Sequence, residues 1–337
     1  MNKSKKNILF KCDTDSGKFA GTGHLKRINE IFRSVKKKYK NKYNYHFLFK
    51  KLNDTESLVR KTLNHRFLLY TNDLNKKLNF INKQDVVIND TPDGIGYKFD
   101  KILKKKKIKR IITFDDLKKY KCKNITYINS LAYFKKKIIT KSIYQGLKYI
   151  PTKQQNKKYK ITKTQKLNIL ICTGGTDYKH ILIKLVRAIK DLDDLKLNVV
   201  IGSGVKKNNP IFKIRSKNIK IHKNLKTLNK LLQINDLSLV TGGLIMYESL
   251  AQKKVTLVHQ SYNHQANAVK KFSKEKSIYK IGQNDKIFKN KLVLLIKKMI
   301  KYKYLGKEIK NIKSKIDGKG YVRVKKIVYD KINEKNY

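Results

Sequence analysis

Short apolar runs alternate with helix-like segments along most of this chain, and this alternation limits how it can fold more than any other feature. In the first half, the runs that predict strands cover residues 7–12, 45–49, 66–70, 85–88, 110–114 and 125–128. Segments with helical spacing of apolar residues fit between most of them. Strands that alternate with helices form parallel sheets. The sequence therefore predicts an α/β protein with a doubly wound, Rossmann-like sheet.

The alternation becomes unclear after residue 129 and restarts beyond a polar stretch. Further strands are predicted at residues 166–172, 197–201, 219–222, 237–240 and 255–258. A length of 337 residues agrees with two domains. We expect a first domain over 1–150, a linker over 151–165, a second domain over 166–300 and basic helices over 301–337. Two Rossmann-like domains of this kind are expected to face a central cleft, with ligands bound at the carboxyl ends of the strands.

The chain is strongly basic, with a formal net charge of +58. Such a charge favours nucleic acid or an anionic membrane surface as a partner. However, only eight of the 82 basic residues are arginine, and the lysines are spread over the whole length. This composition is typical of the codon bias of an AT-rich genome, and no RNA-binding motif is present. We expect no specific nucleic-acid partner, and a weak attraction to anionic membranes.

Other composition features exclude several classes of protein. No run of about 18 apolar residues predicts a membrane span, and the first ten residues do not resemble a signal peptide. The expected location is therefore the cytoplasm. The three cysteines, Cys12, Cys122 and Cys172, form no Cys-x-x-Cys pair, so we assign neither a disulfide framework nor a metal site. No cofactor is predicted.

The first candidate site follows the first predicted strand. Gly21 and Gly23 bring His24, Lys26 and Arg27 to the start of a predicted helix. Glycines allow a close approach of backbone to ligand, and a histidine at this place can act as a base over a phosphorylated substrate. The alternative interpretation is an ordinary turn with a structural histidine.

A second glycine loop follows the first strand of the second half, before a helix predicted from about residue 178 to 192. The loop consists of Gly174, Gly175, Thr176 and Asp177. A helix that starts after a glycine turn offers free N–H groups to an anion. The loop lacks the Gly-Lys-Ser/Thr ending of a Walker motif. Its alternative interpretation is a tight turn in which Thr176 or Asp177 caps the helix.

Two further segments complete the set of candidates. Gly242 and Gly243 lead into a predicted helix that carries Glu248, whose carboxylate could accept hydrogen bonds from ribose hydroxyls. Glu248 could equally complement the helix dipole. Asn263 and Gln265 stand at the next helix start, where amides bind phosphate or sugar hydroxyls, or cap the helix.

Taken in order, these motifs resemble a known family. It contains the UDP-sugar hydrolases of pseudaminic-acid biosynthesis and the related glycosyltransferases predicted for spore-coat polysaccharide synthesis. The shared elements span roughly residues 7–275: Asp13, the Gly-x-Gly-His-x-x-Arg segment, Phe114-Asp115-Asp116, Gly174 to Asp177, Gly242-Gly243, Glu248 and Asn263 to Gln265.

The resemblance implies the two-domain fold called GT-B and a UDP-linked amino or deoxy sugar as substrate. It implies that the second domain holds UDP, with the Gly174–Asp177 loop near the diphosphate and Glu248 near the ribose. His24 would activate water for attack at the anomeric carbon, and Lys26 or Arg27 would stabilise the leaving diphosphate. Asp13 and Asp115 would orient His24 or bind the sugar. In this fold the last helix is expected to pack back on the first domain.

Two alternative functions stay open at this stage, a glycosyltransferase and a basic nucleic-acid-binding protein. A glycosyltransferase would transfer the sugar to a glycan or lipid acceptor, whereas a hydrolase needs only water. The helix-like segment 28–39 combines apolar residues with lysines and arginine, as a helix at an anionic membrane does. The same pattern is typical of a helix that packs on the core with a solvated outer face, which is the interpretation we favour.

Overall fold

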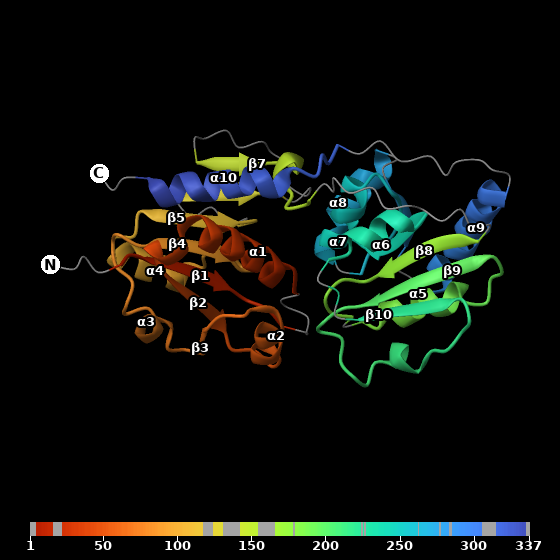
Figure 1. Cartoon of the computed structure of the whole chain (residues 1–337), viewed down its shortest axis with the longest axis horizontal. Coiled ribbons are helices and arrows are strands. Elements are labelled where there is room, and N and C mark those ends of the chain that lie inside the picture. Colours follow the sequence, from red (N-terminus) through yellow and green to blue (C-terminus); the bar gives the residue numbers. More distant parts are fainter. Residues whose placement is uncertain are drawn as a thin grey trace. The chain divides into compact units, whose positions relative to one another are not determined.

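The structure of the chain is a computed structural model. It describes residues 5–15, 22–116, 124–130, 142–153, 166–177, 179–223, 225, 227–261, 263–275, 278–282, 285–304 and 315–334. The chain divides into two compact units, one formed by Met1–Pro151 with Lys319–Tyr337 and the other by Thr152–Gly318. We call these units the first domain and the second domain (Figure 1).

The first domain is built on a parallel sheet with the strand order β3-β2-β1-β4-β5-β6-β7. The strands are β1 (Asn7–Cys12), β2 (Asn44–Lys50), β3 (Leu68–Tyr70), β4 (Val86–Asp90), β5 (Arg110–Phe114), β6 (Ile125–Asn129) and β7 (Ile143–Gln145). The order reverses between β1 and β4, and the carboxyl ends of strands at such a reversal flank the binding crevice of doubly wound sheets.

The second domain repeats this plan with the strand order β10-β9-β8-β11-β12-β13, again with every described pairing parallel. Its strands are β8 (Leu167–Cys172), β9 (Leu195–Ile201), β10 (Ile219–Lys223), β11 (Leu237–Thr241), β12 (Val255–His259) and β13 (Tyr279–Gly282). Here the order reverses between β8 and β11, so the loops after these two strands lie at the corresponding position.

Helices connect the strands in both domains. The first domain holds α1 (Thr22–Tyr39), α2 (Thr55–Thr62), α3 (Leu74–Lys77), α4 (Tyr97–Lys105) and α10 (Gly320–Asn333), with short 3₁₀ turns at Lys40–Lys42 and Leu147–Tyr149. The second holds α5 (Ile181–Ile189), α6 (Asn229–Ile234), α7 (Leu244–Ala251), α8 (Ala266–Lys274) and α9 (Asp285–Tyr304), with 3₁₀ turns at Pro210–Lys213 and Asn263–Gln265.

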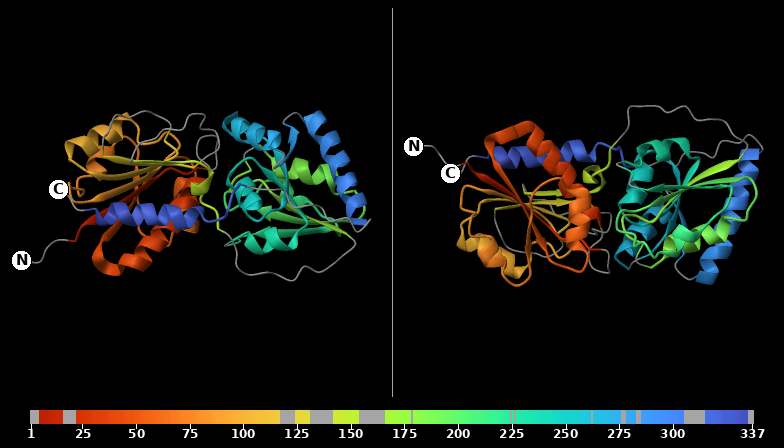
Figure 2. Two further views of the ribbon diagram at one scale, coloured as in Figure 1. Left: turned by 90° about the horizontal axis from the view of Figure 1, so that it is seen from above. Right: turned by 60° about the horizontal axis from the view of Figure 1, so that its bottom comes forward.

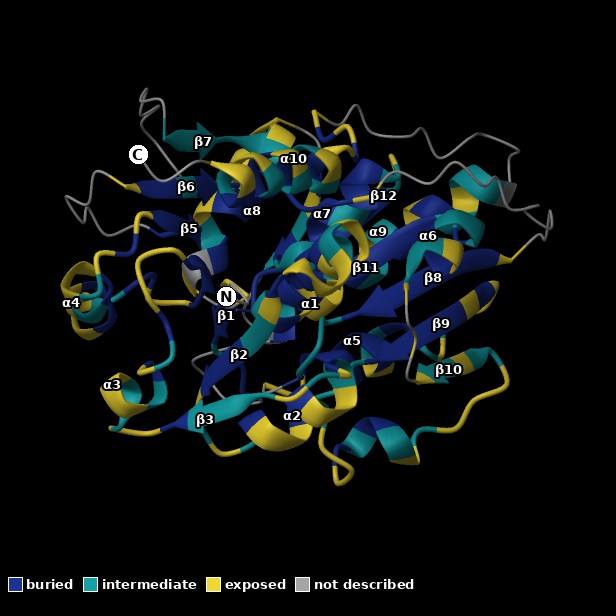
Figure 3. Ribbon diagram, turned by 60° about the vertical axis from the view of Figure 1, so that its left-hand side comes forward, coloured by how far each residue is buried: buried dark blue, intermediate teal, exposed yellow. Residues whose placement is uncertain are grey.

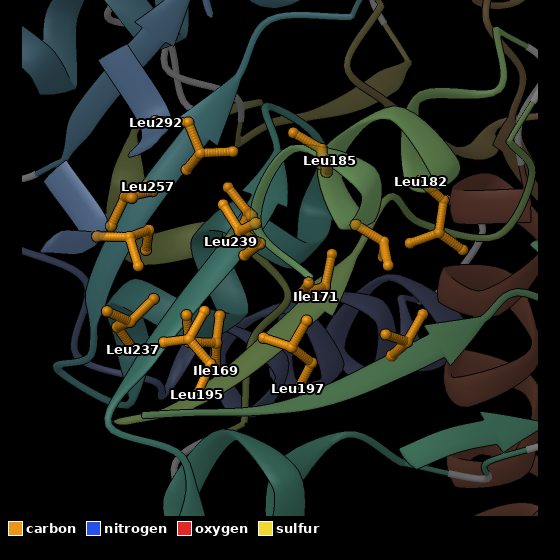
Figure 4. Close-up of a cluster of buried hydrophobic side chains, with 14 of the residues drawn as sticks. Ile169, Ile171, Leu182, Leu185, Leu195, Leu197, Leu237, Leu239, Leu257 and Leu292 are labelled. Atoms are coloured by element: carbon orange, nitrogen blue, oxygen red, sulfur yellow. The ribbon is translucent and has the colours of Figure 1, made fainter. Parts of the chain in front are cut away.

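The central strands β1 and β8 are buried along their whole length, as Figure 3 shows for β8. Successive side chains of a strand point to opposite faces. Ile8 and Phe10 of β1 therefore join the core under α1 and α10, whereas Leu9 joins the core under α4. In the second domain, leucine and isoleucine side chains of β8, β9 and β11 pack against α5 and α9 (Figure 4).

Helix α10 is the last described element, yet it packs on the first domain, beside α1 and β5 (Figure 2). Val324, Ile327, Val328 and Ile332 are buried there. Gly320 starts the helix against the backbone of Ile150, where an added Cβ would lie 1.6 Å from the Ile150 carbonyl oxygen. Helix α9, by contrast, belongs to the second domain up to Tyr304.

Every strand predicted from the sequence is present, but two strands were missed. These are β7 and β13, short strands at a sheet edge, where the pairing partner rather than an apolar run decides the conformation. The prediction of a helix from residue 178 was wrong in its start, because α5 begins at Ile181 after His180, whose φ is +52°. The helix over residues 28–39 packs its apolar side chains into the core, as expected.

Within the described part of the chain, no helix is both long and apolar enough for a transmembrane segment.

Candidate functional site

His24 lies in the first turn of α1, directly beyond the carboxyl end of β1. The helix begins at Thr22, so Gly23 is already helical, while Gly21 falls outside the described residues. The side chain of His24 is 26% exposed. The imidazole therefore reaches the surface at the edge of the sheet where ligands of this kind of fold bind.

Asp90 holds this imidazole from the neighbouring strand. Nδ1 of His24 lies 2.7 Å from Oδ1 of Asp90, which is the last residue of β4 and completely buried. An ionised carboxylate only accepts hydrogen bonds, so Nδ1 donates and carries the proton. In the neutral ring, Nε2 then keeps its lone pair, and in this form a histidine can take a proton from water or a hydroxyl group.

Arg27 lies one helical turn after His24 and points into the domain, with only 3% of its surface exposed. Its Nε and Nη2 donate to the two oxygens of Asp90, both at 2.6 Å. Its Nη1 donates to Oδ2 of Asp115 at 2.5 Å. The guanidinium also lies 4.8 Å from the centre of the Phe114 ring. All three guanidinium nitrogens are thus engaged by carboxylates of the chain itself.

Asp115 reaches this guanidinium through an unusual backbone conformation. Its φ of +46° lies in the left-handed region, directly after the last residue of β5. The turn brings its carboxylate to Arg27 and to the backbone N–H of Ser130, which donates to Oδ1 at 2.8 Å. The next residue, Asp116, instead accepts from the N–H of Ile95 at 2.9 Å.

In this cluster, burial and the charged partners shift the pKa values of Asp90 and Arg27 in opposite directions. Burial alone would raise the pKa of Asp90, but the charge of Arg27 and the hydrogen bonds from Arg27 and His24 together outweigh burial and lower that pKa. Burial would likewise lower the pKa of Arg27, but Asp90 and Asp115 raise it well above its usual value. The cluster therefore holds the ionised carboxylate of Asp90 and a permanent cation behind a partly exposed imidazole.

The other two first-domain candidates have different surroundings. Asp13 lies 3.7 Å from Nζ of Lys11 and accepts from the N–H of Lys50 at 3.0 Å. Lys11 itself is buried against the rings of Tyr70 and Phe99, and burial lowers its pKa despite the charge of Asp13. Lys26, unlike Arg27, is exposed.

In the second domain, the predicted glycine loop meets a second glycine turn. Gly174 has a φ of +99°, and Gly175 accepts a hydrogen bond from the N–H of Gly204 at 2.8 Å. Gly202 packs so closely that an added Cβ would lie 2.3 Å from the Gly174 carbonyl oxygen. The loops after β8 and β9 are therefore fixed against each other by backbone contacts that only glycine permits.

Asp177 closes this loop and binds the first turn of α5. Its Oδ1 accepts from the N–H of Leu182 at 3.0 Å, and Asn209 donates to its Oδ2 at 3.4 Å. Burial raises its pKa, although these hydrogen bonds counteract the rise. Asp177 thus binds an N–H of the first turn of α5, but the N-cap residue is His180 rather than Thr176 or Asp177. Gly174, Gly175 and Thr176 are partly exposed.

The loop after β11 joins the same edge of the sheet. Thr241 donates to the carbonyl oxygen of Thr173 at 3.1 Å. Gly242 packs on Gln265, whose Oε1 lies 3.3 Å from the place of an added Cβ and accepts from the N–H of Ser261 at 3.1 Å. Gly243 directly precedes α7. This helix carries the partly exposed Glu248 in its second turn.

The last candidate, Asn263, is exposed at the start of its 3₁₀ turn.

Sequence reasoning missed three residues that shape these edges: Asp90, Ser130 and Gly202. Gly202 directly follows one predicted strand and Asp90 lies two residues after another, and a glycine or a polar residue near a strand end is a usable signal. Ser130 gives no such signal, because it matters only through the unusual backbone of Asp115.

No family model matches the chain. Among curated proteins, an uncharacterized protein of Methanocaldococcus jannaschii is 26% identical over 268 residues, which are 70% of this chain and 52% of that protein. The spore coat polysaccharide biosynthesis protein SpsG of Bacillus subtilis is 24% identical over 197 residues, 56% of this chain and 58% of SpsG. The chain thus spans little more than half the length of the curated relatives it matches.

Solved structures are similar over nearly the whole chain. S. aureus MnaA in complex with UDP has a TM-score of 0.58 at 14% identity, covering 98% of this chain and 99% of the other. The spinosyn rhamnosyltransferase SpnG with spinosyn aglycone has a TM-score of 0.56 at 9% identity, covering 96% and 95%. At such identities the likeness concerns the fold. The chain has the α/β architecture of GT-B proteins, with two parallel-sheet, Rossmann-like domains.

Proposed function

We propose that this protein hydrolyses a UDP-linked amino or deoxy sugar to free sugar and UDP, in the biosynthesis of a pseudaminic-acid-like sugar or a surface polysaccharide. The observation that carries the proposal is the hydrogen bond of 2.7 Å between Nδ1 of the partly exposed His24 and the buried Asp90. It leaves Nε2 as a base at the carboxyl edge of a Rossmann-like sheet, where a substrate of this fold binds.

In the proposed reaction, Nε2 of His24 removes a proton from water. The water oxygen forms a bond to the anomeric carbon, and the bond from that carbon to the diphosphate oxygen breaks. Its electron pair leaves with UDP. The exposed Lys26 is the cation of this helix turn that can stabilise the charge on the leaving diphosphate.

UDP is proposed to bind at the carboxyl edge of the second sheet. The loop Gly174–Asp177 would lie along the diphosphate, and Gly242, Gly243, Asn263 and Gln265 would line the same edge. Glu248 would accept hydrogen bonds from the ribose. The order reversal between β8 and β11 supports this arrangement, because nucleotides bind at such reversals in doubly wound sheets.

The relatives support the broader part of the proposal. The name of SpsG refers to spore coat polysaccharide biosynthesis, and the MnaA structure contains UDP. Together with the fold they favour an enzyme that uses UDP-sugars.

The second candidate function is a glycosyltransferase that transfers the sugar to a glycan or lipid acceptor. The similarity to the rhamnosyltransferase SpnG favours it, since the two chains share their fold over almost their full lengths. His24 would then deprotonate an acceptor hydroxyl rather than water. The two reactions therefore differ only in the nucleophile that attacks the anomeric carbon.

A panel of UDP-sugars that includes diacetamido-trideoxy sugars separates the two candidates. The purified chain is incubated with each sugar without an acceptor, and UDP release is followed. We expect release from at least one sugar, and a loss of about 100-fold or more in His24→Ala, since a general base typically contributes that much. His24→Ala should still bind UDP. UDP binding without release in the unaltered chain would favour the transferase.

A further inference from the structure

The two cations of the second turn of α1, Lys26 and Arg27, are neighbours in sequence but differ in their surroundings. Lys26 is exposed, whereas Arg27 is buried and donates three hydrogen bonds of 2.5–2.6 Å to Asp90 and Asp115. Only 3% of the surface of Arg27 is exposed, and drawing its guanidinium out toward a diphosphate would leave two buried carboxylates without their cation. That is costly.

We propose that Arg27 is a positioning residue that fixes the orientation of His24 through Asp90, and that Lys26 alone of these two cations contacts the diphosphate. This inference rests on the proposed function for its catalytic part. We call Arg27, Asp90 and Asp115 the guanidinium clamp.

Geometry at Asp90 is the first argument. Arg27 binds both carboxylate oxygens, and one of them, Oδ1, also accepts from His24. The planar guanidinium binds a carboxylate side-on through two parallel hydrogen bonds, which fixes the plane of that carboxylate. Fixing the plane of Asp90 fixes the direction in which Oδ1 accepts, and therefore the ring of His24.

The second argument is the strained backbone at Asp115. A φ of +46° is uncommon for a residue with a side chain, and it persists here because Asp115 is held by both Arg27 and Ser130. The clamp thus joins α1 to the ends of β4 and β5 and to the residue after β6. Strain of this kind concentrates at sites that need a fixed geometry.

The test compares Arg27→Lys with Arg33→Lys, the same substitution at an exposed position six residues later on α1. A lysine keeps the charge but cannot bind Asp90 with two parallel hydrogen bonds. With a UDP-sugar that the chain hydrolyses, we expect Arg27→Lys to lower kcat by roughly 10- to 100-fold, the usual cost of losing a partner that orients a functional side chain. KM and inhibition by UDP should change less than about threefold, and Arg33→Lys should leave both unchanged.

Lys26→Ala provides the opposite pattern. We expect it to raise KM and to weaken inhibition by UDP, because it removes a charged contact to the diphosphate. If Arg27→Lys instead weakens inhibition by UDP with kcat unchanged, Arg27 is a diphosphate ligand and the inference is overturned.

A second measurement needs neither turnover nor a folded variant. Long-range ¹H–¹⁵N correlation spectra of the unaltered full-length chain report which ring nitrogen of His24 carries the proton when the ring is neutral. The inference requires the Nδ1–H form, and the Nε2–H form would overturn it. If no UDP-sugar is hydrolysed, the proposed function fails, while the spectrum still decides whether Nδ1 of His24 donates to Asp90, as the clamp requires.

Discussion

At the residue scale, Asp90 is the group on which the first-domain site depends. It is completely buried, yet it accepts hydrogen bonds from both His24 and Arg27. A buried carboxylate without partners would be expensive, so the two side chains of α1 stabilise Asp90 as much as Asp90 orients them. Chemistry and stability are therefore coupled at this position.

The pKa of Asp90 makes a prediction about stability in acid. Because this pKa is lowered in the folded chain, the stabilisation is present above the unfolded-state value near pH 4 and is lost as the pH falls through the folded-state pKa. Urea unfolding at a series of pH values from 6 to 3 should therefore give a free energy of unfolding that falls less steeply with acid in Asp90→Asn. An identical slope in the variant and the unaltered chain would show that Asp90 titrates alike in both states.

At the scale of elements, the loops at the carboxyl edges are positioned by close backbone contacts. In the second domain, the turn at Gly202 supports the loop at Gly174 and Gly175, with no side chain between them. In the first domain, Gly320 allows α10 to begin against Ile150. These contacts join segments distant in sequence, and each gives a prediction.

Gly202→Ala should weaken UDP binding. The new methyl group would lie 2.3–2.4 Å from the carbonyl oxygens of Gly174 and Gly175, so the loop proposed to hold the diphosphate has to move. Isothermal titration with UDP should show an affinity at least about tenfold lower, because a misplaced loop loses one or more charge-assisted hydrogen bonds. Ser203→Ala, which adds no atom to the same turn, is the matched control. Equal affinities in the two variants would contradict UDP binding at this loop.

Gly320→Ala should destabilise the first domain. A Cβ 1.6 Å from the Ile150 carbonyl oxygen forces the start of α10 away from its site and loosens the burial of Val324 and Ile327. We expect a loss of about 2–4 kcal/mol in the free energy of unfolding, in the range of severe packing changes. Val322→Ala on the same helix changes a side chain that is 69% exposed and should cost less than about 0.5 kcal/mol. Chemical denaturation of both variants measures the difference.

The sequence predicted features that depend on neighbouring residues better than features that depend on contacts between residues far apart in the chain. The strands and the position of His24 at a helix start follow from local periodicity and glycine placement, and both could be read from the chain. The pairing of His24 with Asp90 could not, because the two residues are 66 positions apart in the sequence and meet only at the edge of the assembled sheet. For the same reason, the carboxylate partners of Arg27 and the edge strands β7 and β13 appear only once the sheet is assembled.

At the scale of the whole molecule, two domains with separate cores share one very basic chain. The second domain is a continuous segment, Thr152–Gly318, with its own core around β8, β9 and β11. The first domain instead needs α10 from the far end of the sequence. The net charge of +58 acts over both domains, so we expect weak, salt-sensitive attraction to anionic membranes in addition to specific UDP binding.

This organisation predicts how fragments behave. The fragment 152–318 should fold cooperatively and bind UDP within about threefold of the full chain, because its core and the proposed UDP-binding loops are complete. The fragment 1–151 should be unfolded or strongly destabilised, because it lacks the buried face of α10. Circular dichroism melts and UDP titration of both fragments test this, and a stable 1–151 fragment would contradict the structural role of α10.

The most direct test of the central claim, that His24 directs water to the anomeric carbon, is hydrolysis in H₂¹⁸O. A UDP-sugar that releases UDP is incubated in labelled water without an acceptor, and both products are analysed by mass spectrometry. The account predicts one ¹⁸O atom in the free sugar, none in UDP, and no labelled sugar above background with His24→Ala. Label in UDP, or labelled sugar at full rate from His24→Ala, would contradict it.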